Sequence, residues 1–220
     1  MKIIIYSYWF LPKRMGGTEM ATHNIAKRLS KNNEVHIITS LEDKLENNWK
    51  GPYFVHRISW PKIKGLGILI FWLKIFICTY KINPDIIHAQ GLSMGIPAYI
   101  FKKFFNIPYI MWGRGSDVYL NHKNIEKLLL KKVINNSCSV IALTNYMRKI
   151  LIKTYGYENI HVIHNGIEIN RLNNKKYSNK EINILFVGSL RKVKGVEFLI
   201  KAMEIAVKNK NDLRLIIVGD

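Results

Sequence analysis

The chain has 220 residues, of which 48% are hydrophobic, and such a chain can bury a substantial core, so the sequence excludes a disordered protein. Thirty-four Lys and Arg residues against fifteen Asp and Glu residues give a formal net charge of +19, which favours phosphate-rich partners such as nucleotides or an anionic membrane surface. The two cysteines, Cys78 and Cys138, stand inside apolar runs, so we expect buried thiols in a reducing compartment, the cytoplasm, and no disulfide framework.

Short apolar runs recur from end to end of the chain and predict strands. They occupy residues 2–8, 34–39, 53–58, 85–89, 108–112, 139–143, 160–164, 183–188 and 213–219. Several are apolar at consecutive positions, which is typical of strands covered on both faces. The first run begins at the second residue, so we expect no secretory signal.

Segments with helical periodicity lie between these runs. The clearest is 196–207, where apolar residues recur at i, i+3, i+4, i+7 and i+11. Further helices are predicted around Ala21, Ile25 and Leu29 and at residues 65–80, 92–105, 123–136 and 145–155. Strand and helix alternate throughout, which predicts the α/β class with a doubly wound parallel sheet.

The segment 65–80, "GLGILIFWLKIFICTY", is the most apolar of the predicted helices. Lys64, Gly67, Phe71, Lys74, Cys78 and Lys81 are spaced to line one helix face, which leaves the remaining surface apolar. The segment is short for a transmembrane span and contains a lysine. A packed surface helix is the first interpretation, and the alternatives are a helix that also touches a membrane interface and a membrane span.

A polar, Asn-rich stretch at 170–181 interrupts the pattern and predicts a boundary. We assign 1–168 to an N-terminal Rossmann-like domain, 169–181 to a linker, and 182–220 to the first β-α-β unit of a second such domain. About forty residues bury too little surface to fold alone. The second domain is therefore expected to be truncated.

The loop "LPKRMGGTEM" (11–20) follows the first strand and is the first candidate site. Ligands of open α/β sheets bind at the carboxyl ends of the strands. Gly16 and Gly17 would let a substrate approach the backbone, and the start of the following helix attracts phosphate. The simpler interpretation is a loop capped by Thr18, with Glu19 favourable in the first helical turn.

Two further loops follow predicted strands. "WGRGSDVY" (112–119) offers the donors of Arg114 and the carboxylate of Asp117, although a glycine turn with an Asp cap explains it equally well. "VGSLRKVKGVEFLI" (187–200) carries Arg191, Lys192 and Lys194 before a helix start, a placement that favours a bound anion. His161 and His164 are three apart on a predicted strand and face opposite ways, so we expect no metal site.

Taken in order, five stretches resemble the retaining glycosyltransferases of family 4, which have the two-Rossmann-domain GT-B fold. The stretches are the Gly-Gly-x-Glu loop at 16–19, "PDIIHAQG" (84–91), "GRGSDVY" (113–119), "VIHNGIE" (162–168) and "LFVGSLRKVKG" (185–195). Together they span nearly the whole chain. The resemblance implies transfer of a sugar from a nucleotide-sugar donor, usually a UDP- or GDP-sugar, with retention and without a metal or other cofactor.

The resemblance also implies roles for single residues. Gly16 and Gly17 would bind the donor diphosphate from the N-terminal side, and Lys194 would bind it from the C-terminal side. Asn165 and Gly166 would mark the hinge. The remaining assignments are Arg114 and Asp117 as catalytic residues and Glu19 on the acceptor side of the donor cleft between the domains.

Three departures from the family pattern affect these assignments. Ser189 stands where the family usually has arginine, and Arg191 would substitute for it. Arg114 stands where many members have histidine. The family's Glu-x7-Glu motif is absent, so we expect little or no activity from these 220 residues alone.

Two other functions fit the same features. One is another GT-B enzyme such as a sugar-nucleotide epimerase, which shares the phosphate site but needs no acceptor. The other is a non-catalytic module that binds anions or an anionic membrane, for which Lys123, Lys127 and Lys131 form a basic helical stripe. Nucleic acid is not an expected partner, because no recognition motif is present. Peripheral membrane contact fits a transferase whose acceptor is lipid-linked.

Overall fold

The computed structural model describes residues 1–12, 15–41, 51–61, 63, 66–119, 123–166, 182–210 and 212–219. The chain forms two compact units, Met1–Ile167 and Glu168–Asp220. The predicted linker, 169–181, lies outside the described residues.

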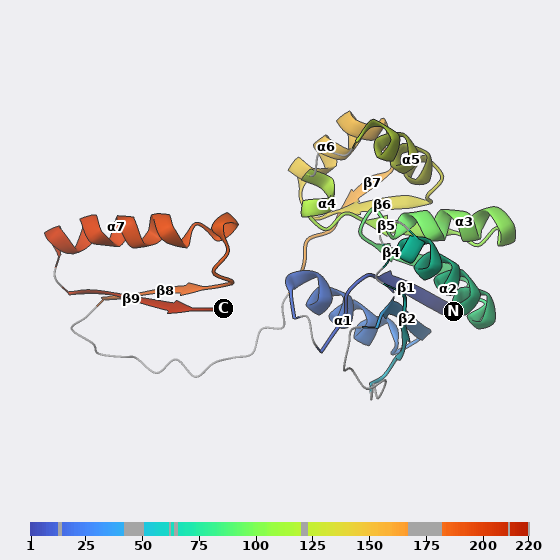
Figure 1. Ribbon diagram of the computed structural model, residues 1–220, viewed down its shortest axis with the longest axis horizontal. Coiled ribbons are helices and arrows are strands. Elements are labelled where there is room, and N and C mark those ends of the chain that lie inside the picture. Colours follow the sequence, from blue (N-terminus) through green and yellow to red (C-terminus); the bar gives the residue numbers. More distant parts are fainter. Residues whose placement is uncertain are drawn as a thin grey trace. The chain divides into compact units, whose positions relative to one another are not determined.

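Unit 1 is built on a seven-stranded sheet in which each neighbouring pair is parallel (Figure 1). Its strands are β1 (Lys2–Ser7), β2 (Glu34–Ser40), β3 (Phe54–Ile58), β4 (Ile86–Gln90), β5 (Tyr109–Trp112), β6 (Ser139–Ala142) and β7 (Ile160–Val162). Their order across the sheet is β3-β2-β1-β4-β5-β6-β7. The order changes direction between β1 and β4, and this confirms the predicted doubly wound sheet.

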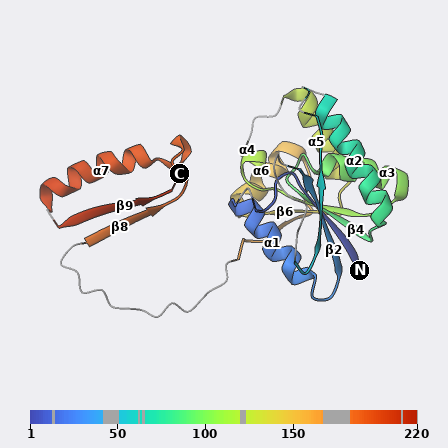
Figure 2. The same cartoon turned by 60° about the horizontal axis from the view of Figure 1, so that its bottom comes forward.

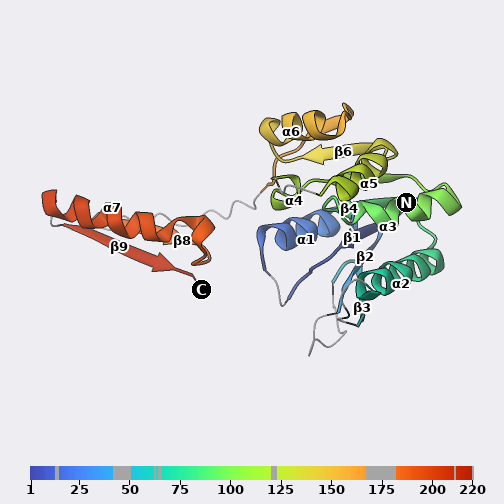
Figure 3. The same ribbon diagram turned by 45° about the horizontal axis from the view of Figure 1, so that its top comes forward.

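Helices cover both faces of this sheet. They are α1 (Gly17–Leu29), α2 (Leu66–Ile82), α3 (Gly95–Phe105), α4 (Ser116–Tyr119), α5 (Asn124–Asn135) and α6 (Asn145–Tyr155). Figure 2 shows α1 on the opposite side of the sheet from α2 and α3. In Figure 3 the short α4 is drawn between α6 and α1, and it packs against α6. The sequence did not predict α4, because four residues are too few to show a helical period.

The core consists of two apolar layers, one on each face of the sheet. Alternate residues of β1 enter different layers: Ile3 and Ile5 pack on the α1 side, and Ile4 and Tyr6 pack on the other. The Tyr6 hydroxyl shares a 2.6 Å hydrogen bond with Oγ1 of Thr79 on α2. Burial raises the pKa of Tyr6, so this polar pair stays neutral inside the core.

Helix α2 packs by a different face from the one the sequence suggested. Gly67 and Phe71 were expected on the polar side, yet both are buried against the sheet together with Ile75 and Thr79. Lys74 of the expected face is exposed. Since α2 is apolar almost all round, its period could not identify the packed face. Among the described residues, no helix combines the length and apolar character needed to cross a membrane.

Gly67 provides a stability test of this packing. A Cβ atom there would lie 2.2 Å from the carbonyl oxygen of Pro61, whereas a Cβ at Gly17, the first residue of α1, meets nothing within 4 Å. We expect Gly67→Ala to lower the free energy of unfolding by about 1–3 kcal/mol through overpacking. Gly17→Ala should be neutral or slightly stabilising. Urea denaturation of both variants measures the difference, and equal stabilities would contradict this packing.

The two cysteines differ from each other. Cys78 on α2 is half-buried, but Cys138 is exposed, so the expectation of two buried thiols was wrong for Cys138. Cys138 precedes β6 at the amino edge of the sheet, outside the part of the apolar run that forms the strand.

Unit 2 contains a parallel pair of strands and a helix. Strand β8 (Ile182–Val187) pairs in register with β9 (Leu213–Val218), and a 3-10 turn, η1 (Lys192–Lys194), precedes α7 (Val196–Asn209). No described residue of this unit is buried, and large side chains such as Leu185 stay exposed. By itself the unit therefore buries little apolar surface.

Candidate functional site

The candidate site lies at the carboxyl edge of the unit 1 sheet, where β1, β4 and β5 end. Strands β1 and β4 are neighbours, but their following segments lead to opposite faces of the sheet. Such a switch point leaves a crevice outside the strand ends, which is the usual ligand position in doubly wound folds. The described residues of the predicted loops at 11–20 and 112–119 lie at this edge.

The start of α1 presents an open backbone at this edge. Gly16 is the N-cap residue, no side chain caps the helix, and α1 begins at Gly17. The simpler interpretation, a Thr18 cap, was therefore wrong; Thr18 lies inside the first turn, and its carbonyl oxygen accepts a hydrogen bond from Thr22. At Gly16 an added Cβ would meet only the flexible Glu19 carboxylate. The first-turn N–H groups thus have no side-chain cap and can face a ligand.

Asp117 connects the loops that follow β4 and β5. Its Oδ2 accepts a 2.9 Å hydrogen bond from the backbone N–H of Leu92, after β4. Its Oδ1 accepts a 2.8 Å bond from the backbone N–H of Arg114, after β5. Gly91 has a φ of +95°, a conformation that favours glycine, where the chain passes Asp117. Through these two bonds Asp117 holds the loops after β4 and β5 together.

Arg114 places a cation among these loops. Its Nη2 donates to Oε1 of Gln90, and its guanidinium carbon lies 4.0 Å from the ring centre of Trp112. The Nε and Nη1 atoms are buried and have no hydrogen-bond partner among the described residues. Burial lowers the pKa of Arg114 to about 10, while the carboxylates of Asp117 and Glu19 act in the opposite direction. The guanidinium therefore stays charged at neutral pH, with donors left over.

His88 lies behind this arginine and is buried. Its ring stacks on Trp112 with centroids 5.6 Å apart, and its Nε2 lies 3.4 Å from Nε2 of Gln90. Burial, and secondarily the charge of Arg114, lowers the pKa of His88 to about 3. The imidazole is therefore neutral at physiological pH.

No site role was predicted for His88 and Gln90, and Trp112 was not predicted to support Arg114. The available signal was a pair of polar residues on an otherwise apolar strand. A buried polar side chain needs a partner, and two of them at a strand's carboxyl end indicate a site.

The structure brings together five of the predicted site residues and leaves the others elsewhere. Gly16, Gly17, Glu19, Arg114 and Asp117 share the carboxyl edge of unit 1. The others are Asn165 and Gly166, exposed after β7, and Arg191 and Lys194, exposed in the loop between β8 and α7 of unit 2. Within the described residues, no group of three or more His, Cys, Asp or Glu side chains is arranged to hold a metal ion.

The unit 2 loop forms its own small cationic turn. Arg191 precedes η1 and donates from Nε to Oγ of Ser189, 3.3 Å away. Gly195, with φ +69°, ends η1 and starts α7. This turn places the exposed side chain of Lys194 directly before the start of a helix, an arrangement that suits an anion.

Comparison with known proteins identifies relatives over the whole chain. The family described as Glycosyltransferase Family 4 matches residues 15–171, and Glycosyl transferases group 1 matches residues 168–220. An uncharacterized glycosyltransferase of Methanocaldococcus jannaschii is 27% identical, and the alignment covers 100% of this chain and 63% of the relative. The chain thus spans less than two thirds of the length of this curated relative.

Solved structures share the fold at low sequence identity. Sucrose-phosphate synthase from Thermosynechococcus elongatus has a TM-score of 0.76 and 14% identity, over 99% of this chain and 62% of that chain. Anabaena HepE in complex with UDP and glucose has a TM-score of 0.74 and 18% identity, over 100% of this chain and 61% of that one. UDP-GlcNAc 2-epimerase from Methanocaldococcus jannaschii has a TM-score of 0.61 and 16% identity, over 99% and 65%.

These structural matches support the GT-B fold, which the transferases and the epimerase among them share. More than half of the chain matches the first family, over a region that contains Gly16, Gly17, Glu19, Arg114 and Asp117. The chain therefore belongs to Glycosyltransferase Family 4.

Proposed function

We propose that the whole protein transfers a sugar from a UDP- or GDP-sugar to a glycan or lipid-linked acceptor with retention, without a metal or other cofactor. The observation that carries this proposal is the open backbone at Gly16 and Gly17 beside the charged Arg114, at the switch point of a family 4 sheet. The structural neighbour HepE, which holds UDP and glucose, supports a nucleotide-sugar donor.

The proposed chemistry depends on the leaving nucleoside diphosphate. Negative charge grows on its phosphates as the bond to the sugar breaks, and fixed donors lower the barrier by stabilising that charge. Gly16 and Gly17 would offer backbone N–H groups at the positive end of α1. In unit 2, the exposed cations Arg191 and Lys194 would bind the same kind of group.

Arg114 and Asp117 have different proposed tasks. The unpartnered Nε and Nη1 of Arg114 would donate to the oxygen atoms of donor or acceptor after a small side-chain movement. Asp117 accepts two backbone N–H groups, so it would act by positioning the loops that carry Arg114 and Leu92. Asn165 and Gly166, the last described residues of unit 1, remain the proposed hinge. Cytoplasmic residence is proposed because Cys78 and Cys138 are free thiols.

Gly17→Ala tests the donor site. The added methyl group meets nothing within 4 Å in the free protein, so the fold should be unaffected. It would occupy the space through which a phosphate approaches the backbone, so we expect the KM for the nucleotide sugar to rise about tenfold or more. Asn32→Ala, in the turn after the other end of α1, is the matched control. An unchanged KM with an unchanged unfolding midpoint would contradict the assignment.

Product analysis distinguishes retaining sugar transfer from epimerisation of the donor and from binding without turnover. The whole protein is incubated with UDP- or GDP-sugars and with glycan or lipid-linked acceptors. A product whose anomeric configuration matches the donor supports retaining transfer. An epimerised donor without glycosylated product would assign an epimerase, and binding without turnover would assign a non-catalytic module.

A further inference from the structure

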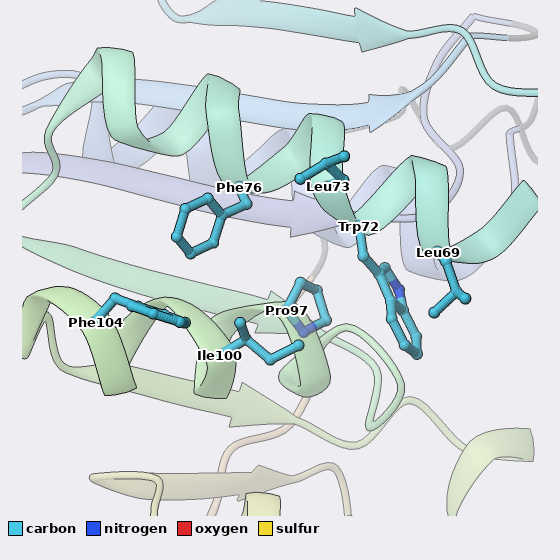
Figure 4. Close-up of a pocket in the computed structure, with 7 residues that line it drawn as sticks. All are labelled: Leu69, Trp72, Leu73, Phe76, Pro97, Ile100 and Phe104. Carbon is cyan, nitrogen blue, oxygen red and sulfur yellow. The ribbon is translucent and has the colours of Figure 1, made fainter.

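An apolar groove of about 330 Å³ lies between α2 and α3, outside the site described above (Figure 4). Side chains from both helices face each other across it. They are Leu69, Trp72, Leu73, Phe76, Pro97, Ile100 and Phe104. The indole Nε1 of Trp72 is buried and has no hydrogen-bond partner among the described residues.

The groove belongs to a wider apolar surface, the α2–α3 face, made by the outward side chains of these two helices. Leu69, Leu73 and Phe104 are exposed by 56%, 58% and 72%. Further exposed members are Leu66, Ile77, Tyr80, Ile100 and Phe105. Single exposed apolar residues are ordinary, but a contiguous group of this kind marks an interaction surface.

The charge of this face is entirely positive. Neither α2 nor α3 contains an acidic residue, while Lys74, Lys81 and Lys103 are exposed on them. A second, polar cavity of about 370 Å³ shares Phe104 with the groove. It is lined by Tyr99, Lys102, Lys103, Phe104, Asn106 and Asn136. A cationic pocket thus adjoins an apolar groove, which is the complement of a lipid phosphate joined to acyl chains.

We propose that the α2–α3 face docks on an anionic lipid bilayer. Its leucine and phenylalanine side chains enter the boundary between headgroups and acyl chains, and its lysines contact lipid phosphates. Helix α2 lies in the plane of the surface, since it has 17 residues and is too short to cross the bilayer. A second copy of this face is a poor partner, because its lysines would meet lysines and no carboxylate.

Docking in this way would also orient the protein. Helices α2 and α3 follow β3 and β4 and return across the sheet, so their first turns, with Leu69 and Pro97, lie toward the carboxyl edge. The candidate functional site occupies that same edge. The membrane proposal stands independently of sugar transfer, because it needs only the exposed side chains of two helices.

Vesicle binding without any sugar or nucleotide tests the proposal. The whole protein is mixed with vesicles of phosphatidylcholine alone or of phosphatidylcholine with phosphatidylglycerol, and the bound fraction is measured by sedimentation. We expect binding to the anionic vesicles, weakened by salt. Lys81→Gln with Lys103→Gln should weaken it about 30-fold, since each lysine near the surface raises the binding constant by a factor of about five and the two factors multiply. Leu73→Ser with Phe104→Ser should weaken it at every salt concentration.

Matched controls keep the result specific to this face. Lys27→Gln with Lys31→Gln removes two exposed lysines at the end of α1, on the other side of the sheet, and Ile125→Ser with Leu128→Ser removes two exposed apolar side chains from α5. Both should bind like the unchanged protein. A blue shift of tryptophan emission on binding should disappear in Trp72→Phe. Equal losses in test and control variants, or no binding to anionic vesicles, would overturn the proposal.

Discussion

Replacing Arg114 by glutamine is expected to lower kcat/KM of the whole enzyme about 100-fold while leaving the fold intact. A preorganised donor at a transition state contributes roughly this much when it is removed. The fold should tolerate the change, because Nε and Nη1 of Arg114 are buried without hydrogen-bond partners among the described residues, and the substitution removes these two unsatisfied donors. The lost contacts to Gln90 and Trp112 offset that gain, so the free energy of unfolding should change by at most about 1 kcal/mol.

Two further substitutions sharpen this prediction. Arg114→Lys keeps the charge but loses the planar fork, and it should recover only part of the activity. Arg114→His introduces the residue that many related enzymes have, and it should retain more activity than Arg114→Gln. Steady-state kinetics and urea denaturation are measured on the same preparations. Full activity in Arg114→Gln, or a loss of activity that parallels a loss of stability, would assign Arg114 a purely structural role.

Acidification is expected to destabilise the protein through His88. Its pKa is about 3 in the folded protein and about 6.5 in an unfolded chain, so below pH 6.5 the unfolded state binds the extra proton. The contribution is complete above pH 6.5 and is lost as the pH falls toward 3, at a limiting slope of about 1.4 kcal/mol per pH unit. Lowering the pH from 7 to 5 should therefore cost about 2 kcal/mol from this residue alone.

The comparison variant for this effect is His88→Gln, whose side chain does not titrate. The variant has its own stability, so the informative quantity is the difference between the two proteins in the slope of the free energy of unfolding against pH. Carboxylates and His56 contribute equally to both, so they cancel in that difference. Urea denaturation at pH 7, 6 and 5 measures it. Parallel pH profiles would show that His88 is accessible to protons in the folded state.

Much of the architecture could be predicted from local pattern. Each of the nine apolar runs overlaps a strand, because short runs rich in isoleucine, valine and aromatic residues between helical segments favour strands. The packed face of α2 could not be predicted in this way. Leucine and isoleucine occur on all sides of α2, so the side that packs in the core and the side that forms the α2–α3 face have the same pattern. Only the position of the sheet shows which side is buried.

Part of the candidate site could also be predicted from the sequence, and part of it could not. That the loops carrying Gly16 and Arg114 meet at one edge follows from the parallel sheet, because all its strands end on the same side. The hydrogen bond from the Leu92 N–H to Asp117 joins residues 25 positions apart, so no local sequence pattern predicts it. The depth of His88 behind Trp112 is equally invisible in the sequence, since the same strand pattern would accept a solvent-facing histidine.

The strand order has a consequence for how the chain must fold during synthesis. Strand β1 pairs with β2 on one side and with β4 on the other, so its second edge has no partner until β4 has been made. At about 5–20 residues per second, the roughly 30 residues between the ends of β3 and β4 require a few seconds. During that interval the edge of an isoleucine-rich strand is open to wrong pairing. The nascent protein is therefore most vulnerable to aggregation before Gln90 has left the ribosome.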